Sequence, residues 1–193
     1  VGDNAFLNSV FDGVFDCPDL ITVGNYAFRY SQFNGVFNCQ NLQTVGSLAL
    51  QYSQFNGAFE CKNLQTVDYA AFYYSQFNGV FNCPNLQTVG EYAFENSQFN
   101  GAFECPNLQG VGDQAFENSN FSGSLSLPVC TYIGMRAFGN STFDTITIGS
   151  NASVAPNCIG AHSAEFINDY VANNKKAGTY VWDEATQHWI YQN

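Results

Sequence analysis

The feature that most constrains the fold is repetition with a period of 22 residues. The motif Leu-Gln-Thr-Val begins at Leu42, Leu64 and Leu86, and variants of it begin at Leu20 and Leu108. The full unit reads close to LQTVGxYAFxxSQFNGxFxCPN, and a degenerate copy spans residues 130–151. A unit of this length cannot bury its apolar residues alone, so the repeats are expected to stack as a solenoid.

Phenylalanine is locked to this period. All but one of the 19 phenylalanines fall at three repeat positions. The columns are Phe11, Phe33, Phe55, Phe77, Phe99, Phe121 and Phe143; Phe15, Phe37, Phe59, Phe81 and Phe103; and Phe6, Phe28, Phe72, Phe94, Phe116 and Phe138. Apolar residues at one period lie above their equivalents in the next coil, so the columns predict a continuous core.

Each unit also predicts its local structure. The segment FNGxFxC alternates with period two, which is typical of a half-buried strand, and the following proline ends it. The repeated glycine within this strand is expected to make room beside phenylalanine. The segment VGEYAFEN is too short for a full helix and predicts one helical or 3₁₀ turn. The fold class is therefore a leucine-rich-repeat solenoid of 22-residue coils, each with a short parallel β-strand.

The period divides the chain into two parts. About seven coils, the first one partial, occupy residues 1–151, and residues 152–193 are expected to cap the solenoid. Within that cap, HSAEFINDYVANN predicts a helix and TYVWDEATQHWIYQ predicts a β-hairpin.

The segments VGEYAFENSQFNGAFECP and IGMRAFGNSTFDTITI resemble the BspA-like leucine-rich repeats of bacterial surface proteins, and the resemblance covers residues 1–151. It departs from that family's pattern in a serine column that includes Ser97, and in the cysteine that ends each strand. The resemblance implies a secreted or cell-surface location, and adhesion or interaction with a host protein.

Charge excludes several classes of partner. The net charge is −11, with 5 lysine and arginine residues against 16 aspartate and glutamate residues. Phosphate contacts and anionic membranes both need basic residues, so nucleic-acid binding and membrane docking are not expected. No apolar run approaches the about 20 residues of a membrane span, and no signal peptide is visible at the first residues.

No cofactor, metal or catalytic group is predicted. Five cysteines form one column, Cys17, Cys39, Cys61, Cys83 and Cys105, which is expected to be a ladder of buried thiols. Their spacing does not suit a tetrahedral metal site. A bridge between Cys130 and Cys158 is left open.

The remaining candidates for chemistry are two histidines and one pair of acids. His162 and His188 have no partner at a catalytic spacing and are expected to be solvated or packing residues. Asp12 and Asp16 would lie about 13 Å apart along one strand, farther than an inverting glycosidase requires.

Two exposed surfaces are candidates for binding. The first is the outward face of the strands, namely Asn34, Asn38, Asn56, Glu60, Asn78, Asn82, Asn100 and Glu104, which would suit a flat protein or glycan. The second is a column of Tyr30, Tyr52 and Tyr74, which could support sugar rings or a protein. The alternative for the strand face is a sheet surface that is merely solvated, and the alternative for the tyrosine column is packing between coils.

These observations favour a non-catalytic binding or adhesion module that acts as a monomer on a protein or glycan partner. A glycan-active enzyme on a β-solenoid and a passive spacer for another domain are the alternatives.

Overall fold

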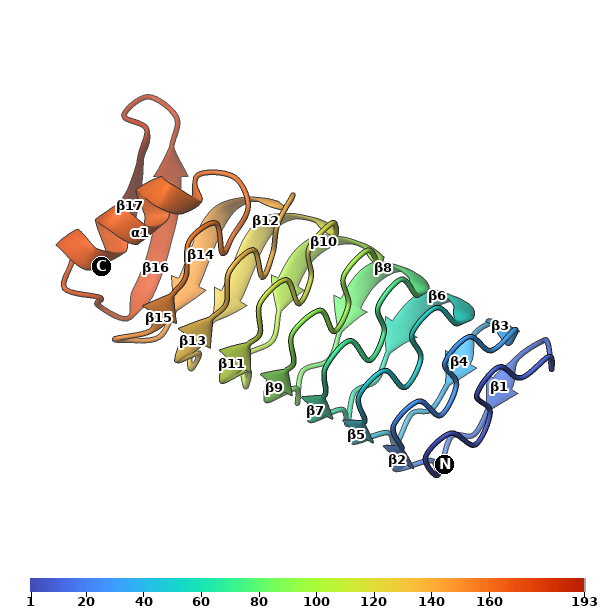
Figure 1. The fold of residues 1–193 in the computed structure, drawn as a ribbon. Coiled ribbons are helices and arrows are strands. Elements are labelled where there is room, and N and C mark those ends of the chain that lie inside the picture. Colours follow the sequence, from blue (N-terminus) through green and yellow to red (C-terminus); the bar gives the residue numbers. More distant parts are fainter. Residues whose placement is uncertain (193) are drawn as a thin grey trace.

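The chain forms an elongated solenoid whose 22-residue coils stack in sequence order from the N-terminus to a C-terminal cap (Figure 1). It is a computed structural model that describes residues 1–192, without the side chains at positions 57, 58 and 60. The predicted outward orientation of Glu60 therefore lies outside the described residues. The predicted leucine-rich-repeat solenoid is confirmed.

The longer strands line one side of the solenoid and pair in parallel through β14. They are β6 (Gln54–Glu60), β8 (Gln76–Asn82), β10 (Gln98–Glu104), β12 (Asn120–Leu127) and β14 (Thr142–Ile148), and the two-residue β3 (Asn34–Gly35) pairs with β6 at the edge of the same sheet. In the first coils the same side is built from β1 (Phe15–Asp16) and β4 (Phe37–Asn38), which pair with each other. Parallel pairing in chain order places each coil directly beside the next.

Two-residue strands form a second parallel sheet of seven strands. They are β2 (Thr22–Val23), β5 (Thr44–Val45), β7 (Thr66–Val67), β9 (Thr88–Val89), β11 (Gly110–Val111), β13 (Tyr132–Ile133) and β15 (Ser153–Val154). Each valine or isoleucine of the first six strands is buried, while the preceding residue lies outward or partly outward. Each coil thus passes from a short strand through a turn segment to a long strand and back.

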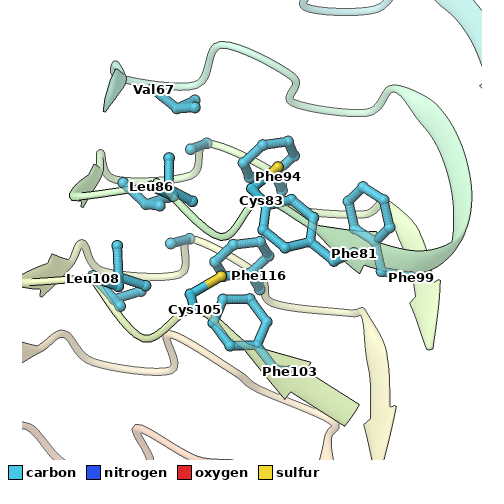
Figure 2. Packing of buried hydrophobic residues seen from close by; sticks show 14 of the residues in the cluster. Val67, Phe81, Cys83, Leu86, Phe94, Phe99, Phe103, Cys105, Leu108 and Phe116 are labelled. Carbon is cyan, nitrogen blue, oxygen red and sulfur yellow. The ribbon is translucent and has the colours of Figure 1, made fainter. Parts of the chain in front are cut away.

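The core consists of the predicted columns. Phe72, Phe94 and Phe116 stack in parallel, with ring centroids 4.7 and 5.1 Å apart. Rings of different columns meet edge to face, as Phe81 does against Phe94 at 5.1 Å. Figure 2 shows one repeated set, with Cys83 and Leu86 in one coil and Cys105 and Leu108 in the next. Edge-to-face contacts between stacked columns are a favoured geometry for aromatic quadrupoles.

One predicted core residue is exposed. The Phe11 side chain is 66% exposed, in contrast to Phe55 and Phe77 in the same column. It lies in the first coil and contacts Phe33 at a centroid distance of 6.4 Å, so one neighbouring coil alone covers it. The prediction that Phe11 is a core residue is wrong, because membership of a repeat column does not ensure that a coil covers the ring on both sides.

The third side of each coil is built from turns instead of the predicted helical or 3₁₀ turn. In the coil of Tyr92, three successive turns form, in which the amides of Ala93, Glu95 and Ser97 donate to carbonyls three residues earlier. The alternate amides, of Tyr92, Phe94 and Asn96, donate to the next coil. Left-handed backbone at Tyr92 and Asn96 prevents helical continuation, and the stack satisfies amides that an isolated turn would leave unpaired.

The strand glycines are needed for backbone conformation, and the prediction that they make room for phenylalanine is wrong. Gly79, Gly101 and Gly123 have φ values of 80°, 77° and 76°. A Cβ atom at any of the three would meet nothing within 4 Å. The strand register shifts between Gly101 and Phe103, so this left-handed glycine occupies a bulge in the ladder.

Helix α1 (Ser163–Ala172) and the hairpin of β16 (Gly178–Asp183) and β17 (His188–Gln192) follow the last coil, as the sequence predicts. Strand β16 pairs antiparallel with β14 and so covers the end of the long-strand sheet. Phe166, Tyr170 and Trp189 are buried between α1 and the hairpin. The Tyr170 hydroxyl donates to the Gly149 carbonyl at 2.6 Å and accepts from the Ala152 amide at 3.0 Å, which fastens the helix to the solenoid.

Candidate binding surface

The outward face of the long strands is a regular polar surface. Strand β8 alternates between exposed residues, such as Asn78, Val80 and Asn82, and the buried Phe77 and Phe81. Of the predicted residues, Asn34, Asn56, Asn78, Asn82, Asn100 and Glu104 are exposed. Asn38 is half-buried, and its side-chain amide donates to Asp16 Oδ1 at 2.7 Å.

A row of glutamines widens this face. Gln32, Gln54, Gln76 and Gln98 precede the asparagine row by two positions and are exposed. The signal that could have found them is the same alternation that identified the asparagines, extended one step toward the strand N-terminus. The two rows are uncharged from the second coil to the fifth, although the chain carries a net charge of −11. This part of the surface therefore suits an uncharged or mixed surface of a partner.

The tyrosine column lies where each turn segment joins its long strand. Tyr30, Tyr52 and Tyr74 are 46%, 40% and 47% exposed. The rings of Tyr30 and Tyr52 stack at 5.3 Å with an interplanar angle of 4°, and those of Tyr52 and Tyr74 stack at 5.3 Å and 23°. All three residues have φ of 55°, a left-handed conformation that costs a tyrosine about 1–2 kcal/mol.

The stacking determines which parts of the tyrosine rings are available to a partner. Parallel rings at this separation cover one another's faces, so the ring edges and hydroxyl groups point toward a partner. The Arg29 guanidinium lies 4.8 Å from the Tyr30 ring centroid, and its Nε donates to Gln51 Oε1. Tyr73 packs edge-on against both Tyr52 and Tyr74. These neighbours hold the rings in place, and preorganised aromatic edges are effective contacts for a protein.

Asparagine replaces tyrosine in the later coils. Asn118 Nδ2 donates to Asn96 Oδ1 at 2.9 Å, and Asn140 Nδ2 donates to Asn118 Oδ1 at 2.6 Å. Their φ values of 63°, 64° and 69° match the left-handed conformation of the tyrosines. One backbone position thus carries an aromatic column in the first half of the solenoid and an amide ladder in the second.

Acidic residues lie beside the later part of this row. Burial, and then the neighbouring Glu117 carboxylate, raise the pKa of Glu95 above its usual value. Burial and then Glu95 raise the pKa of Tyr73 to about 12, which keeps its hydroxyl protonated. Glu117 forms an ion pair with Arg136 at 3.7 Å. The row beside the tyrosine column therefore continues with two glutamates, Glu95 and Glu117, of which Glu117 is paired with Arg136.

The described residues contain no group of three or more His, Cys, Asp or Glu side chains placed to hold a metal ion. All seven cysteines are free, so the bridge left open between Cys130 and Cys158 does not form. Burial and then Cys17 raise the pKa of the Cys39 thiol to about 12, and burial and then Cys39 raise the pKa of Cys61 to about 12. Such thiols are protonated and poorly reactive at neutral pH.

The two histidines have packing partners that their spacing in the sequence did not show. The His162 ring stacks on Trp182 with centroids 3.8 Å apart, and His188 Nδ1 lies 3.0 Å from Asp169 Oδ1. Asp169 also accepts a hydrogen bond from the Trp189 amide at 2.7 Å. The Asp169–His188 contact therefore joins α1 to β17.

None of the helices within residues 1–192 has the length and apolar character needed to cross a membrane.

Comparison with known proteins identifies the repeat. No curated protein and no solved structure is significantly similar to the chain. The sequence model described as a BspA type leucine-rich repeat region, with six copies, matches residues 1–122 and 61–167. Together the matches span residues 1–167, which include the whole repeat region and the start of α1, and the chain therefore belongs to the BspA-type leucine-rich-repeat family.

Proposed function

We propose that this chain is a non-catalytic binding module that recognises a protein through the tyrosine column and the adjoining Gln and Asn rows of the strand face. The observation that carries the proposal is the exposed stack of Tyr30, Tyr52 and Tyr74. Leucine-rich repeats generally serve as binding scaffolds, and tyrosine is enriched among residues that dominate the energy of protein interfaces.

A protein suits this surface better than a sugar platform does. A sugar ring that stacks on tyrosine needs a free aromatic face, and here each ring covers its neighbour. The hydroxyl groups and ring edges instead offer apolar contact together with hydrogen bonding, which is the usual contribution of tyrosine to protein interfaces. The glutamines Gln32, Gln54 and Gln76 extend the contact area. Because they are uncharged, covering them does not incur the free-energy cost of removing a charge from water.

We place the module outside the cell, on a bacterial surface or in secreted form, because the family is typically surface-associated. Seven free cysteines are unusual in an oxidising compartment. Six of them are buried, however, and burial raises the pKa of Cys39, Cys61 and Cys83, so little thiolate is available for oxidation.

The proposal is tested by immobilising the chain and measuring binding of purified fibronectin, laminin, fibrinogen and collagen, each before and after enzymatic deglycosylation. We expect saturable binding of at least one protein that survives deglycosylation. Binding that disappears with the glycan, or no saturable binding to any of the four, would contradict a protein-binding role. Deletion of the two repeats spanning residues 42–85 removes Tyr52 and Tyr74, so binding that is retained after this deletion would contradict the tyrosine column as the binding surface.

A further inference from the structure

A recessed surface lies at the C-terminal ends of the long strands. It is a shallow groove of about 610 Å³ between the ends of these strands and the short-strand sheet. One wall is the row Gln65, Gln87, Gln109 and Thr131, whose members are 22 residues apart and so come from successive coils. The opposite wall is Asn85, Asn107 and Val129, with the same period. The groove therefore runs along the solenoid axis.

The asparagine wall is fixed by the solenoid itself. Asn85 Nδ2 donates to the Lys62 carbonyl at 2.9 Å, and Asn107 Nδ2 donates to the Pro84 carbonyl at 3.0 Å. Both side-chain oxygens are without a donor among the described residues. The wall thus presents acceptors in a set orientation, and a preorganised acceptor loses little entropy when a ligand binds.

The glutamine wall has a regular spacing, and its side chains are available to a ligand. The Gln87 amide donates to the Gln65 carbonyl and the Gln109 amide donates to the Gln87 carbonyl, both at 2.8 Å, which holds the row at the coil spacing. The three side chains are exposed and form no hydrogen bond with other described side chains or backbone groups. Each side-chain amide can both donate and accept, which matches a ligand hydroxyl group that does the same.

Charge and shape restrict the ligand. Although the chain carries a net charge of −11, none of the groove residues is charged. An anionic polymer would require basic residues and a cationic one would require carboxylates. The groove also lacks the aromatic or arginine anchors on which protein interfaces depend, since Val129 is its one apolar residue.

From this geometry we propose that the groove binds a linear, uncharged polysaccharide laid along the solenoid axis, with one sugar per coil. Stacked strands recur about every 4.8 Å, and an extended β-1,4-linked hexopyranose chain advances by a similar distance per sugar. Each sugar would then meet a side chain of the row Gln65, Gln87, Gln109 and Thr131, and two of the sugars would also meet the side-chain oxygen of Asn85 or Asn107. Because four coils contribute to the glutamine wall, about four sugars are held.

This site is separate from the protein-binding surface proposed above. In each coil the tyrosine precedes the long strand, as Tyr74 precedes β8, whereas the groove residues Asn85 and Gln87 follow it. Neither proposal depends on the other.

The test is calorimetric titration of the whole chain with cellohexaose, β-1,4-mannohexaose and chitohexaose, with hexagalacturonate as the anionic probe. We expect at least one neutral hexaose to bind saturably. Its shorter homologues, titrated in the same way, are expected to show affinity that rises with chain length to about four sugars and then levels off. The Gln65→Ala/Gln87→Ala/Gln109→Ala variant is expected to bind at least about tenfold more weakly, since it loses three hydrogen-bonding amides. The matched Gln32→Ala/Gln54→Ala/Gln76→Ala variant, which removes glutamines of the same period at the other strand end, is expected to bind like the wild type.

Three results would overturn this proposal. They are no saturable binding of any neutral hexaose, preference for hexagalacturonate, or equal binding by the two triple variants. Loss of protein binding, instead of sugar binding, in the Gln65/Gln87/Gln109 variant would assign the groove to a protein. A circular dichroism spectrum and a thermal midpoint equal to those of the wild type establish that both variants are folded.

Discussion

The phenol rings of Tyr30 and Tyr52 are parallel to within 4°, with their centroids 5.3 Å apart. The 22-residue period produces this relationship directly, because residues one period apart occupy the same place in adjacent coils. The ring faces are therefore used within the solenoid, and the edges and hydroxyl groups are left for a partner. This division supports a protein contact at the column and leaves the uncharged amide groove for a different ligand.

Gly101 and Gly110 are expected to respond oppositely to alanine, although a Cβ atom at either one meets nothing within 4 Å. Gly101 has φ of 77°, so Gly101→Ala places an L-residue in left-handed backbone and lowers the free energy of unfolding by about 1–2 kcal/mol. Gly110→Ala, in β11, is expected to leave it unchanged or raise it by up to about 1 kcal/mol. Urea denaturation measures both, and equal losses would contradict a conformational role for Gly101.

The cysteines are expected to react in two groups. At pH 8 a thiol reagent should label the half-buried Cys17 first, because burial keeps the other six cysteines protected. Burial and then Cys61 raise the pKa of Cys83 well above its usual value. Titration in denaturant should give seven thiols per chain. Five thiols in denaturant would indicate a disulfide, and rapid labelling of all seven in the native protein would contradict the buried ladder.

Glu95→Gln is expected to stabilise the protein at neutral pH. Burial and the Glu117 carboxylate raise the pKa of Glu95 in the folded state, so between its unfolded and folded pKa the native protein binds more protons. Stability therefore falls as pH rises through this window. At pH 7 the variant should gain up to about 1 kcal/mol, and the gain should shrink toward acidic pH as the wild-type carboxyl becomes protonated.

Urea denaturation between pH 4 and pH 8 measures this difference. The exposed Glu104→Gln is the control and should change the free energy of unfolding by no more than about 0.5 kcal/mol at any pH. A gain from Glu95→Gln that grows toward acidic pH would contradict the assigned direction of the pKa shift.

Tyr170→Phe is expected to weaken the attachment of the cap. It removes the hydroxyl that bonds to the Gly149 carbonyl and the Ala152 amide, and it leaves two buried backbone groups without that partner. A loss of about 2 kcal/mol is expected, together with faster hydrogen exchange at the Ala152 amide. Tyr191→Phe removes an exposed hydrogen bond to the Ala177 carbonyl and should cost much less. Equal effects of the two substitutions would contradict this role of Tyr170.

Much of the fold was predictable because the repeat fixes both the period and the buried positions. The column of Phe72, Phe94 and Phe116 follows from sequence spacing alone. The conformation of the turn segment was not predictable, since a pattern as short as VGEYAFEN cannot distinguish a helical turn from consecutive turns with left-handed residues. Tyr92 and Asn96 adopt positive φ because the next coil accepts the hydrogen bonds of their amides. That stabilisation comes from stacking and leaves no local sequence signal.

The candidate surfaces were only partly predictable. Alternation along the strands identified exposed residues such as Asn78 and Asn100. The orientation of the tyrosine rings and the groove between Gln87 and Asn107 depend on how the coils pack in three dimensions. The Asp169–His188 contact likewise joins elements far apart in the sequence, whose meeting depends on the path of the cap.

If the tyrosine column is the protein-binding surface, replacing its tyrosines with the asparagine of the later coils should weaken binding. Tyr30→Asn/Tyr52→Asn/Tyr74→Asn places asparagine where the chain already carries it in left-handed backbone, so the fold should be retained. The control, Asn96→Ser/Asn118→Ser/Asn140→Ser, alters the same row in the other half.

The measurement is the dissociation constant for the protein ligand found in the matrix-protein screen. We expect this dissociation constant to increase at least about tenfold for the tyrosine variant, because removing three exposed aromatic contacts costs more than about 1.4 kcal/mol. For the control we expect no more than about a twofold change. Equal dissociation constants for the tyrosine variant and the wild type would contradict the claim.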